Sequence, residues 1–283
     1  MRHVQKNINI EKVRFHLSKL YVVCFERLLY KNWFNPLVTL YINFRSFPFQ
    51  QAWKLPLFAY GWPKLFSLYG SMECVDKCCT GMIKLNQTNT GMPNNPGVST
   101  AINNWGKIIF HGKCQIYTAN KLNVGRNAIL ELGEDTKIMC MCNITAYKSV
   151  RIGAKSWIVH RCQVMDSNFH LVANFNKMII PHNYKSIEIG DYCWICNSST
   201  ISAGAKLPNK TIVASNSLVN KDMSDIPEES IVGGIPAKLL AIGFRRVDSK
   251  KLEETVNKFF LSHPEIPFFS LNLNEHSSIC DAD

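Results

Sequence analysis

The sequence predicts an all-β solenoid, a chain wound into coils that each have three flat sides. The main observation is a repeat of six residues that runs from Ile189 to Val219 without interruption. The first position of each repeat is aliphatic and the fifth position is small. Helices repeat every 3.6 residues and strands every two, so neither explains this period. In a three-sided coil, the aliphatic side chain fills the axis and the small one fits at the corner.

The same register extends upstream of this stretch. After an insertion of two residues it continues to Val164, and it then breaks until Ile189. The break opens with the sequence Asp-Ser-Asn-Phe-His at residues 166–170. A regular solenoid that is interrupted once, with a histidine at the start of the interruption, indicates a functional loop. The upstream first positions are Leu132, Ile138, Ile144, Ile152, Ile158 and Val164.

Four motifs together resemble those of one known family. They are residues 166–170, 189–195, 219–222 and 231–238, and they cover, with the repeats, roughly residues 105–240. In this order they are typical of the hexapeptide-repeat acyltransferases, and within them of the O-acetyltransferases of sugars and surface polysaccharides. The resemblance implies a left-handed parallel β-helix, which departs from the usual right-handed crossover.

Three regions are predicted along the chain. Residues 1–63 form a helical and aromatic cap, with a helix over residues 1–35 that ends at Pro36. Residues 64–240 form the left-handed β-helix domain, and residues 241–283 form a C-terminal helix, at about Lys250–Leu261, followed by a tail. The cap has two compatible interpretations. It closes the open first coil, as solenoid ends require, or it lies peripherally on a membrane through its aromatic residues and lysines.

Composition narrows the classes of partner. The chain has 32 Lys and Arg against 21 Asp and Glu, a formal net charge of +11. A basic surface favours anionic partners such as the phosphates of coenzyme A, sugar nucleotides or an anionic membrane face. Nucleic acid is disfavoured, because no helix-turn-helix, zinc-finger or RNA-binding motif is present. With 46% hydrophobic and 19% charged residues, a globular chain is expected.

Eleven cysteines raise the question of disulfides. The sequence has no apolar run suited to a secretion signal, so we expect a reducing cytoplasmic location, at the inner face of the membrane if the cap touches lipid. Free cysteine packs as a small apolar residue, which explains those at the fifth position. Zinc binding by Cys74, Cys78 and Cys79 is an open alternative, although we expect acyl transfer itself to need no metal. The fifth-position cysteines are Cys142, Cys162 and Cys193.

Acyl transfer to a hydroxyl needs a base and a stabilised carbonyl oxygen. Histidine suits the first task because its ordinary pKa of about 6.5 leaves it mostly neutral in the cytoplasm. His170 stands in the motif at the break, and the resemblance implies that it is the general base. Asp166 and Asn168 are candidates to orient the imidazole or to bind the acceptor, although side chains of this kind in a tight turn also cap their own backbone. Asn143, on the preceding coil, is a candidate to hold the sugar.

The stacking of coils suggests where acetyl-CoA binds. Three repeats make one coil, so Asn197 should lie beneath Ser215, and Ala203 beneath Lys221. The resemblance implies that these columns, with Trp194, line the coenzyme groove, and that Lys238 lies near the nucleotide phosphates. Two residues depart from the family pattern, Cys196 where glycine is usual and Ser215 where a small apolar residue is common.

The sequence therefore predicts an acetyl-CoA-dependent O-acetyltransferase that acts on a hydroxyl of a sugar or a surface polysaccharide precursor. The resemblance implies a homotrimer with sites between subunits. Three alternatives stay open. The same histidine could serve N-acetylation of a nucleotide-linked amino sugar. A γ-carbonic-anhydrase-like zinc enzyme would need three clustered histidines, but His160, His170 and His182 are widely spaced. The last alternative is a non-catalytic solenoid.

Overall fold

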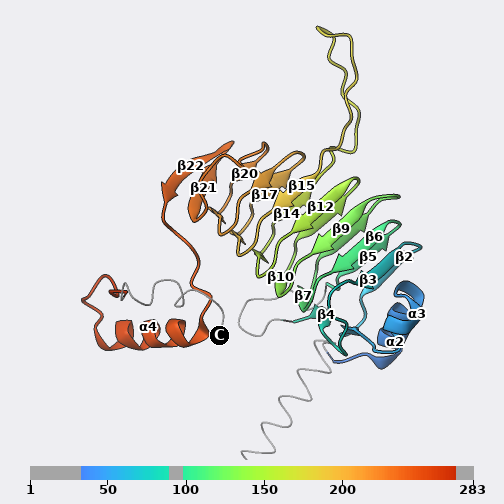
Figure 1. The fold of residues 1–283 in the computed structure, drawn as a ribbon, viewed down its shortest axis with the longest axis horizontal. Coiled ribbons are helices and arrows are strands. Elements are labelled where there is room, and N and C mark those ends of the chain that lie inside the picture. The colour runs from blue at the N-terminus through green and yellow to red at the C-terminus, as the bar shows by residue number, and fades with distance from the viewer. Residues whose placement is uncertain (1–32, 89–97, 272–283) are drawn as a thin grey trace, which may run out of the picture.

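The computed structural model describes residues 33–88 and 98–271. Strands of this part form three parallel sheets that make the three sides of a prism (Figure 1). The first sheet contains β1 (Leu57–Ala59), β4 (Ile83–Gln87), β7 (Cys114–Tyr117), β10 (Thr136–Ile138), β13 (Trp157–Ile158), β16 (Trp194–Ile195), β19 (Ile212–Val213), β21 (Ser230–Gly234) and β22 (Ala237–Ile242). The second contains β2 (Lys64–Leu68), β5 (Ala101–Asn104), β8 (Lys121–Val124), β11 (Asn143–Ala146), β14 (Gln163–Met165), β17 (Thr200–Ser202) and β20 (Leu218–Val219). The third contains β3 (Ser71–Cys74), β6 (Lys107–Phe110), β9 (Ile129–Leu132), β12 (Ser149–Ile152), β15 (Ile187–Ile189) and β18 (Lys206–Leu207).

The winding is that of a β-helix. Strands β1 to β17 each pair in parallel with the strand three places later, and β19 pairs in parallel with β21. Among the named strands, only β21 and β22 pair antiparallel, as a hairpin at the C-terminal end. Trp194 pairs with Ile212 and Ile195 with Val213, so these coils contain 18 residues. The fold class is the predicted one, a left-handed parallel β-helix with short helices at both ends.

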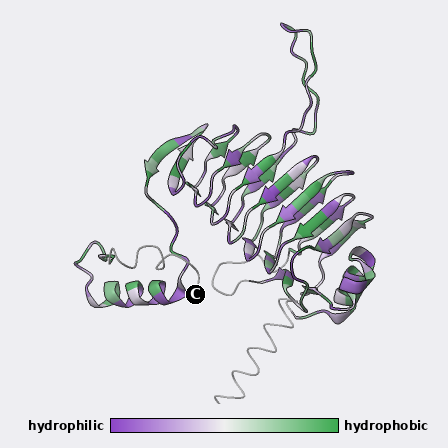
Figure 2. Cartoon of the chain, in the orientation of Figure 1, coloured by the Kyte–Doolittle hydropathy of each residue, from purple (hydrophilic) through white to green (hydrophobic). Residues whose placement is uncertain are grey.

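The core contains the residues that the repeat places at the axis. Ile195, Ile201 and Val213, at first positions, are completely buried, and so are Cys193 and Ser199 at fifth positions. Polar and apolar residues are interspersed along the strands (Figure 2) because alternate side chains point outward. The described cysteines are free thiols, and burial raises the pKa of Cys193 to about 12, so this thiol packs in its neutral form.

The corners depend on left-handed backbone. The fourth position of the repeat has a positive φ in coil after coil, for example 54° at Lys155, 59° at Ser198 and 58° at Lys210. These three residues are not glycine, so each of their corners carries a conformation that costs roughly 1–2 kcal/mol per residue. Gly204 occupies the same position of its own repeat, with a φ of 87°. Packing of the adjacent small residue and bonds between coils offset this cost. The sequence analysis did not anticipate this feature.

The cap differs from the expectation in two ways. Pro36 begins a helix instead of ending one: α2 (Pro36–Ser46) starts there because proline suits the first helical position. Asn35 caps this helix, since its side chain accepts the Val38 N–H at 3.1 Å. The first strand, β1, begins at Leu57, before the expected start of the solenoid at residue 64. The helix predicted over residues 1–35 lies almost wholly outside the described residues.

Side chains from the cap bond to the exposed edge of the first sheet. The Asn43 amide bonds both backbone groups of Leu57, at 2.7 and 3.1 Å. Thr39 accepts the Ala59 N–H at 3.0 Å, and Asn35 donates to the Gly61 carbonyl at 2.8 Å. An unpaired strand edge is prone to association. Here α2, which is followed by the short α3 (Phe49–Ala52), covers the edge of β1.

After β22, the chain returns along the outer face of the first sheet. The Arg246 guanidinium lies 3.8 Å from the ring centre of Trp157 and pairs with Asp248 at 3.0 Å. The helix α4 (Lys250–Ser262) follows, as predicted, and Ser249 caps it by accepting the Leu252 N–H at 3.2 Å. Within the described ranges, no helix has the length and apolar character needed to cross a bilayer.

Candidate active site

The break in the repeat forms a projecting arm. Residues 166–186 leave the corner between the second and third sheets, after β14, and return to β15 (Figure 1). The two halves of the arm pair near the root at Ser167 and Tyr184, and again near the tip at Asn174 and Ile179. The arm is therefore an ordered hairpin-like extension, and it holds the predicted catalytic histidine.

Asp166 lies inside the wall at the root of the arm. Its side chain is completely buried, and its carboxylate accepts backbone N–H bonds from Tyr147, Lys148 and Ser149 at 2.7, 2.7 and 2.9 Å. Burial raises the pKa of this carboxyl, while the three N–H donors oppose the shift. The expectation that Asp166 contacts the acceptor or the imidazole does not agree with this geometry, because both oxygens already bond the corner of the preceding coil.

His170 projects from a tight turn. The Ser167 hydroxyl accepts the Phe169 N–H at 3.0 Å, and the His170 N–H donates to the Asn168 carbonyl at 2.7 Å. Phe169 has a φ of 59°, and its ring meets Tyr147 edge-on with 5.4 Å between centroids. His170 itself is exposed. The turn thus fixes the backbone of the histidine and leaves its imidazole accessible.

The predicted acceptor-binding asparagines lie on two different elements, Asn168 in this turn and Asn143 on β11. Asn168 is exposed, and its backbone N–H donates to the Asn183 carbonyl across the arm at 3.0 Å. Asn143 begins β11 on the second sheet, and its amide donates to the Met165 sulfur at 3.4 Å, one residue before Asp166. Both can face a ligand outside the second sheet, so the structure keeps them as candidates.

The predicted coenzyme residues are divided between two corners of one chain. Asn197 and Ser215 lie at the corner between the first and second sheets, where the Asn216 N–H donates to the Asn197 carbonyl at 3.0 Å. Ala203 and Lys221 lie at the other end of the second sheet, at the corner that carries the arm. The remaining two are associated with the first sheet, Trp194 on β16 and Lys238 on β22. No single corner unites them with His170.

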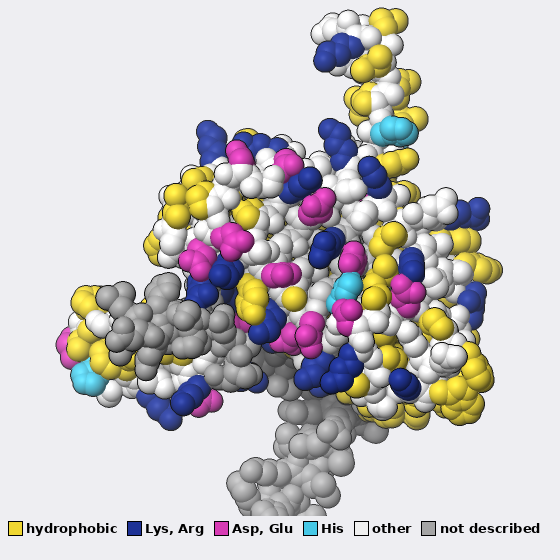
Figure 3. Space-filling model, in the orientation of Figure 1, with side chains coloured by type: hydrophobic (Ala, Val, Ile, Leu, Met, Phe, Trp, Pro, Cys, Tyr) yellow, Lys and Arg dark blue, Asp and Glu magenta, His cyan; other side chains and the backbone are white. Residues whose placement is uncertain are grey.

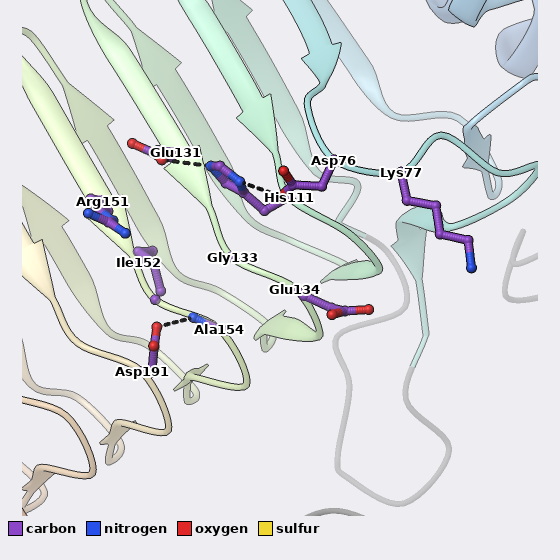
Figure 4. A pocket seen from close by; sticks show the side chains of 11 residues that line it. Asp76, Lys77, His111, Glu131, Gly133, Glu134, Arg151, Ile152, Ala154 and Asp191 are labelled. Carbon is purple, nitrogen blue, oxygen red and sulfur yellow. Dashed lines mark hydrogen bonds and ion pairs between the residues drawn. The ribbon is translucent and has the colours of Figure 1, made fainter.

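A hollow of about 380 Å³ lies elsewhere, on the third sheet and its corner with the first (Figure 4). Its central group is His111, whose Nδ1 lies 2.8 Å from Asp76 and whose Nε2 lies 2.6 Å from Glu131. Desolvation lowers the pKa of His111, but the two carboxylates outweigh it and the net shift is upward. None of the predicted site residues lines this hollow. The repeat pattern contains no signal of the two partners of His111, which are distant from it in sequence.

Cys74, the last residue of β3, has an environment unsuited to a thiolate. Burial, followed by the neighbouring Cys78, raises the pKa of Cys74 to about 12. Within the ranges that the structure covers, no set of three or more His, Cys, Asp or Glu side chains is arranged to hold a metal ion.

Comparison with known proteins agrees with the sequence motifs. No family model matches the chain. It is 24% identical over 147 residues to WbbJ of Escherichia coli K12, named as a candidate lipopolysaccharide biosynthesis O-acetyl transferase, which covers 49% of this chain and 74% of the relative. The chain resembles the hexapeptide-repeat acetyltransferases.

Solved structures of acetyltransferases are also similar to the chain. The polysialic-acid-specific acetyltransferase NeuO is 17% identical, with 73% of this chain and 98% of NeuO covered and a TM-score of 0.45. The polysialic acid O-acetyltransferase OatWY is 17% identical, with 70% and 99% covered and a TM-score of 0.39. The acetyltransferase VCA0836 from Vibrio cholerae, solved with acetyl-CoA, is 25% identical, with 40% and 60% covered and a TM-score of 0.35. The fold assignment itself depends on the strand pairing described above.

Proposed function

We propose that this protein transfers an acetyl group from acetyl-CoA to a hydroxyl of a sugar or of a surface polysaccharide precursor. The single observation that carries the proposal is His170, exposed on a backbone-bonded turn at the main interruption of the solenoid. The relation to the Escherichia coli relative supports the reaction class and the kind of acceptor. The net charge of +11 suits the anionic coenzyme.

The reaction follows from what an accessible imidazole can do. A ring nitrogen of His170 accepts the proton of the acceptor hydroxyl while the oxygen attacks the thioester carbonyl carbon. A C–O bond forms and the C–S bond breaks. The proton then passes from the imidazolium to the departing thiolate of coenzyme A. We assign acceptor binding to Asn168, which is exposed in the turn, and to Asn143, whose amide reaches the Met165 sulfur.

We further propose that the site is shared between subunits of a homotrimer. Within one chain, Asn197 and Ser215 lie at one end of the second sheet, while His170, Ala203 and Lys221 lie at the other. A neighbour that packs beside the prism can bring one corner of its own to the arm of the first chain. Two chains together would then supply Trp194 and Lys238, the two remaining coenzyme contacts, to the same groove.

Replacing the histidine tests the proposal. We expect His170→Ala to lower the rate of acetyl transfer by ~100-fold or more, because a positioned base contributes at least this much. Thioester cleavage can be followed by release of free coenzyme A thiol, with sugar acceptors that offer a hydroxyl or an amine side by side. Preference for the amine would favour N-acetylation.

His263→Ala is a matched control. His263 is an exposed histidine at the end of α4, in a different element, and it stacks on Phe259 with 4.7 Å between centroids. The His263→Ala variant should retain full activity. If His170→Ala also retained full activity while it kept the circular dichroism of the wild type, His170 would not be the base.

A further inference from the structure

The distribution of polar and apolar residues on helix α2 is partly the reverse of that on an ordinary surface helix. Its buried face includes Thr39, Asn43 and Ser46, whereas most residues on its exposed face are apolar. An amphipathic helix normally buries its apolar side. Here the inner face bonds the edge of β1 through Thr39 and Asn43, so polar residues are needed there. That requirement does not explain the apolar outer face.

The outer face continues from α2 onto α3 as one aromatic surface, which we call the cap surface. Phe44 lies 5.3 Å from Trp53 and 6.3 Å from Phe49, and Phe49 lies 5.8 Å from Trp53, measured between ring centroids. Figure 3 shows apolar side chains gathered at this end of the molecule. The cap surface consists of Leu37, Leu40, Tyr41, Phe44, Phe49 and Trp53, which are 42–69% exposed.

The charged residues of the segment that carries the cap surface have one sign. Residues 33–72 contain no Asp or Glu, and their three charged residues are Arg45, Lys54 and Lys64. Twelve of these forty residues are aromatic, against 11% of the whole chain. Aromatic side chains favour the boundary between hydrocarbon and water, and cations beside them favour anionic headgroups. The combination complements an anionic lipid surface in both hydrophobicity and charge.

We infer that the cap surface binds the anionic face of a lipid bilayer. The cap surface would lie on the membrane without α2 crossing it, since α2 has 11 residues and a span needs about 20. The cap lies at one end of the solenoid (Figure 1), so lipid would contact the end of the prism and leave its sheets free for packing between subunits. An acetyltransferase held in this way would act on acceptors at the membrane surface.

Vesicle flotation of the full chain tests the inference without acetyl-CoA, so its outcome is separate from that of the proposed activity. We expect the protein to float with vesicles of phosphatidylcholine and phosphatidylglycerol in low salt, and less with phosphatidylcholine alone. Added salt should weaken binding, because headgroup attraction is screened. The variant Phe44→Ser/Phe49→Ser/Trp53→Ser should bind at least ~10-fold more weakly, since it loses the inserted rings. Arg45→Glu/Lys54→Glu should also lose anionic-vesicle binding.

A matched control lies at the other end of the solenoid. Leu240→Ser/Ile242→Ser/Phe244→Ser removes three apolar side chains that are 51–61% exposed, and it should leave vesicle binding unchanged. Absence of flotation in low salt would overturn the inference, as would equal binding by the aromatic triple variant. A third outcome would also overturn the inference: the protein associates with itself in a concentration-dependent way, does not bind vesicles, and loses this self-association in the aromatic triple variant. The cap surface would then bind a second copy of the chain.

Discussion

At the residue scale, position within the motif decides what a polar side chain can do. Asp166 and His170 are four residues apart in one motif, and both are of types common in active sites. The structure buries Asp166 against three backbone N–H groups and leaves His170 exposed on the turn. Asp166 therefore fixes the root from which the arm projects.

This role predicts a stability effect for Asp166. Asp166→Ala would leave three N–H groups of the preceding corner without their acceptor inside the wall, at a cost of about 3 kcal/mol or more in the free energy of unfolding. Urea unfolding measures it. The exposed Asp225→Ala should change stability by less than about 0.5 kcal/mol. Equal stability of the two variants would rule out the structural role of Asp166.

At the element scale, strands of two to six residues are held together by contacts between coils. His111 is one such contact, because it follows β6 and bonds Asp76 after β3 and Glu131 on β9. Desolvation lowers its pKa, the two carboxylates raise it, and the net shift is upward. Glu134 and Arg151 line the same hollow, so His111 and its two carboxylates lie near further charges of both signs (Figure 4).

The raised pKa predicts a pH-dependent stability difference. A histidine whose pKa is higher in the folded than in the unfolded protein stabilises the fold fully below the unfolded value of about 6.5. This stabilisation is lost as pH rises through the higher folded pKa of His111. His111→Gln should therefore be less stable than the wild type near pH 6, by less than about 1 kcal/mol because the pair is partly exposed, and the gap should shrink above pH 8. Urea unfolding at both values checks it. A gap that widened with pH would contradict the assignment.

At the scale of the whole molecule, the arm and the division of the proposed coenzyme residues between two corners favour an assembly. Phe175 and Met178 at the tip of the arm are 80% and 82% exposed in the single chain. Apolar side chains so far from their own core are typical of residues that a partner covers. The distribution of Asn197 and Lys221 over two corners points the same way, since only a neighbour can bring these corners together.

Sedimentation of the intact chain measures the assembly. We expect a mass about three times that of the 32.2 kDa chain. Phe175→Ser/Met178→Ser should shift the equilibrium towards monomer and lower activity in parallel. Lys177→Ser, at the same tip, should leave the mass unchanged, because its exposed side chain is polar already. A fully active monomer would contradict the shared site.

The sequence by itself determined the solenoid, because its information is local and repeated. Ile195 and Cys193 recur as types every six residues, and three-sided winding is the arrangement that buries both at every turn. The same local reading located the break at His170 and the helix at Lys250. It misread Pro36, because proline both ends helices and begins them.

Only the tertiary structure decided which polar groups were already occupied. The bonds of Asp166 reach back to residues 147–149, and those of Asn43 reach forward to Leu57. His111 joins two carboxylates that lie 35 and 20 residues away. No periodic pattern specifies such pairings, because they depend on which corners stack once the chain has wound. The orientation of α2 also depends on the wound structure. Its composition is mostly apolar, but its buried face is largely polar.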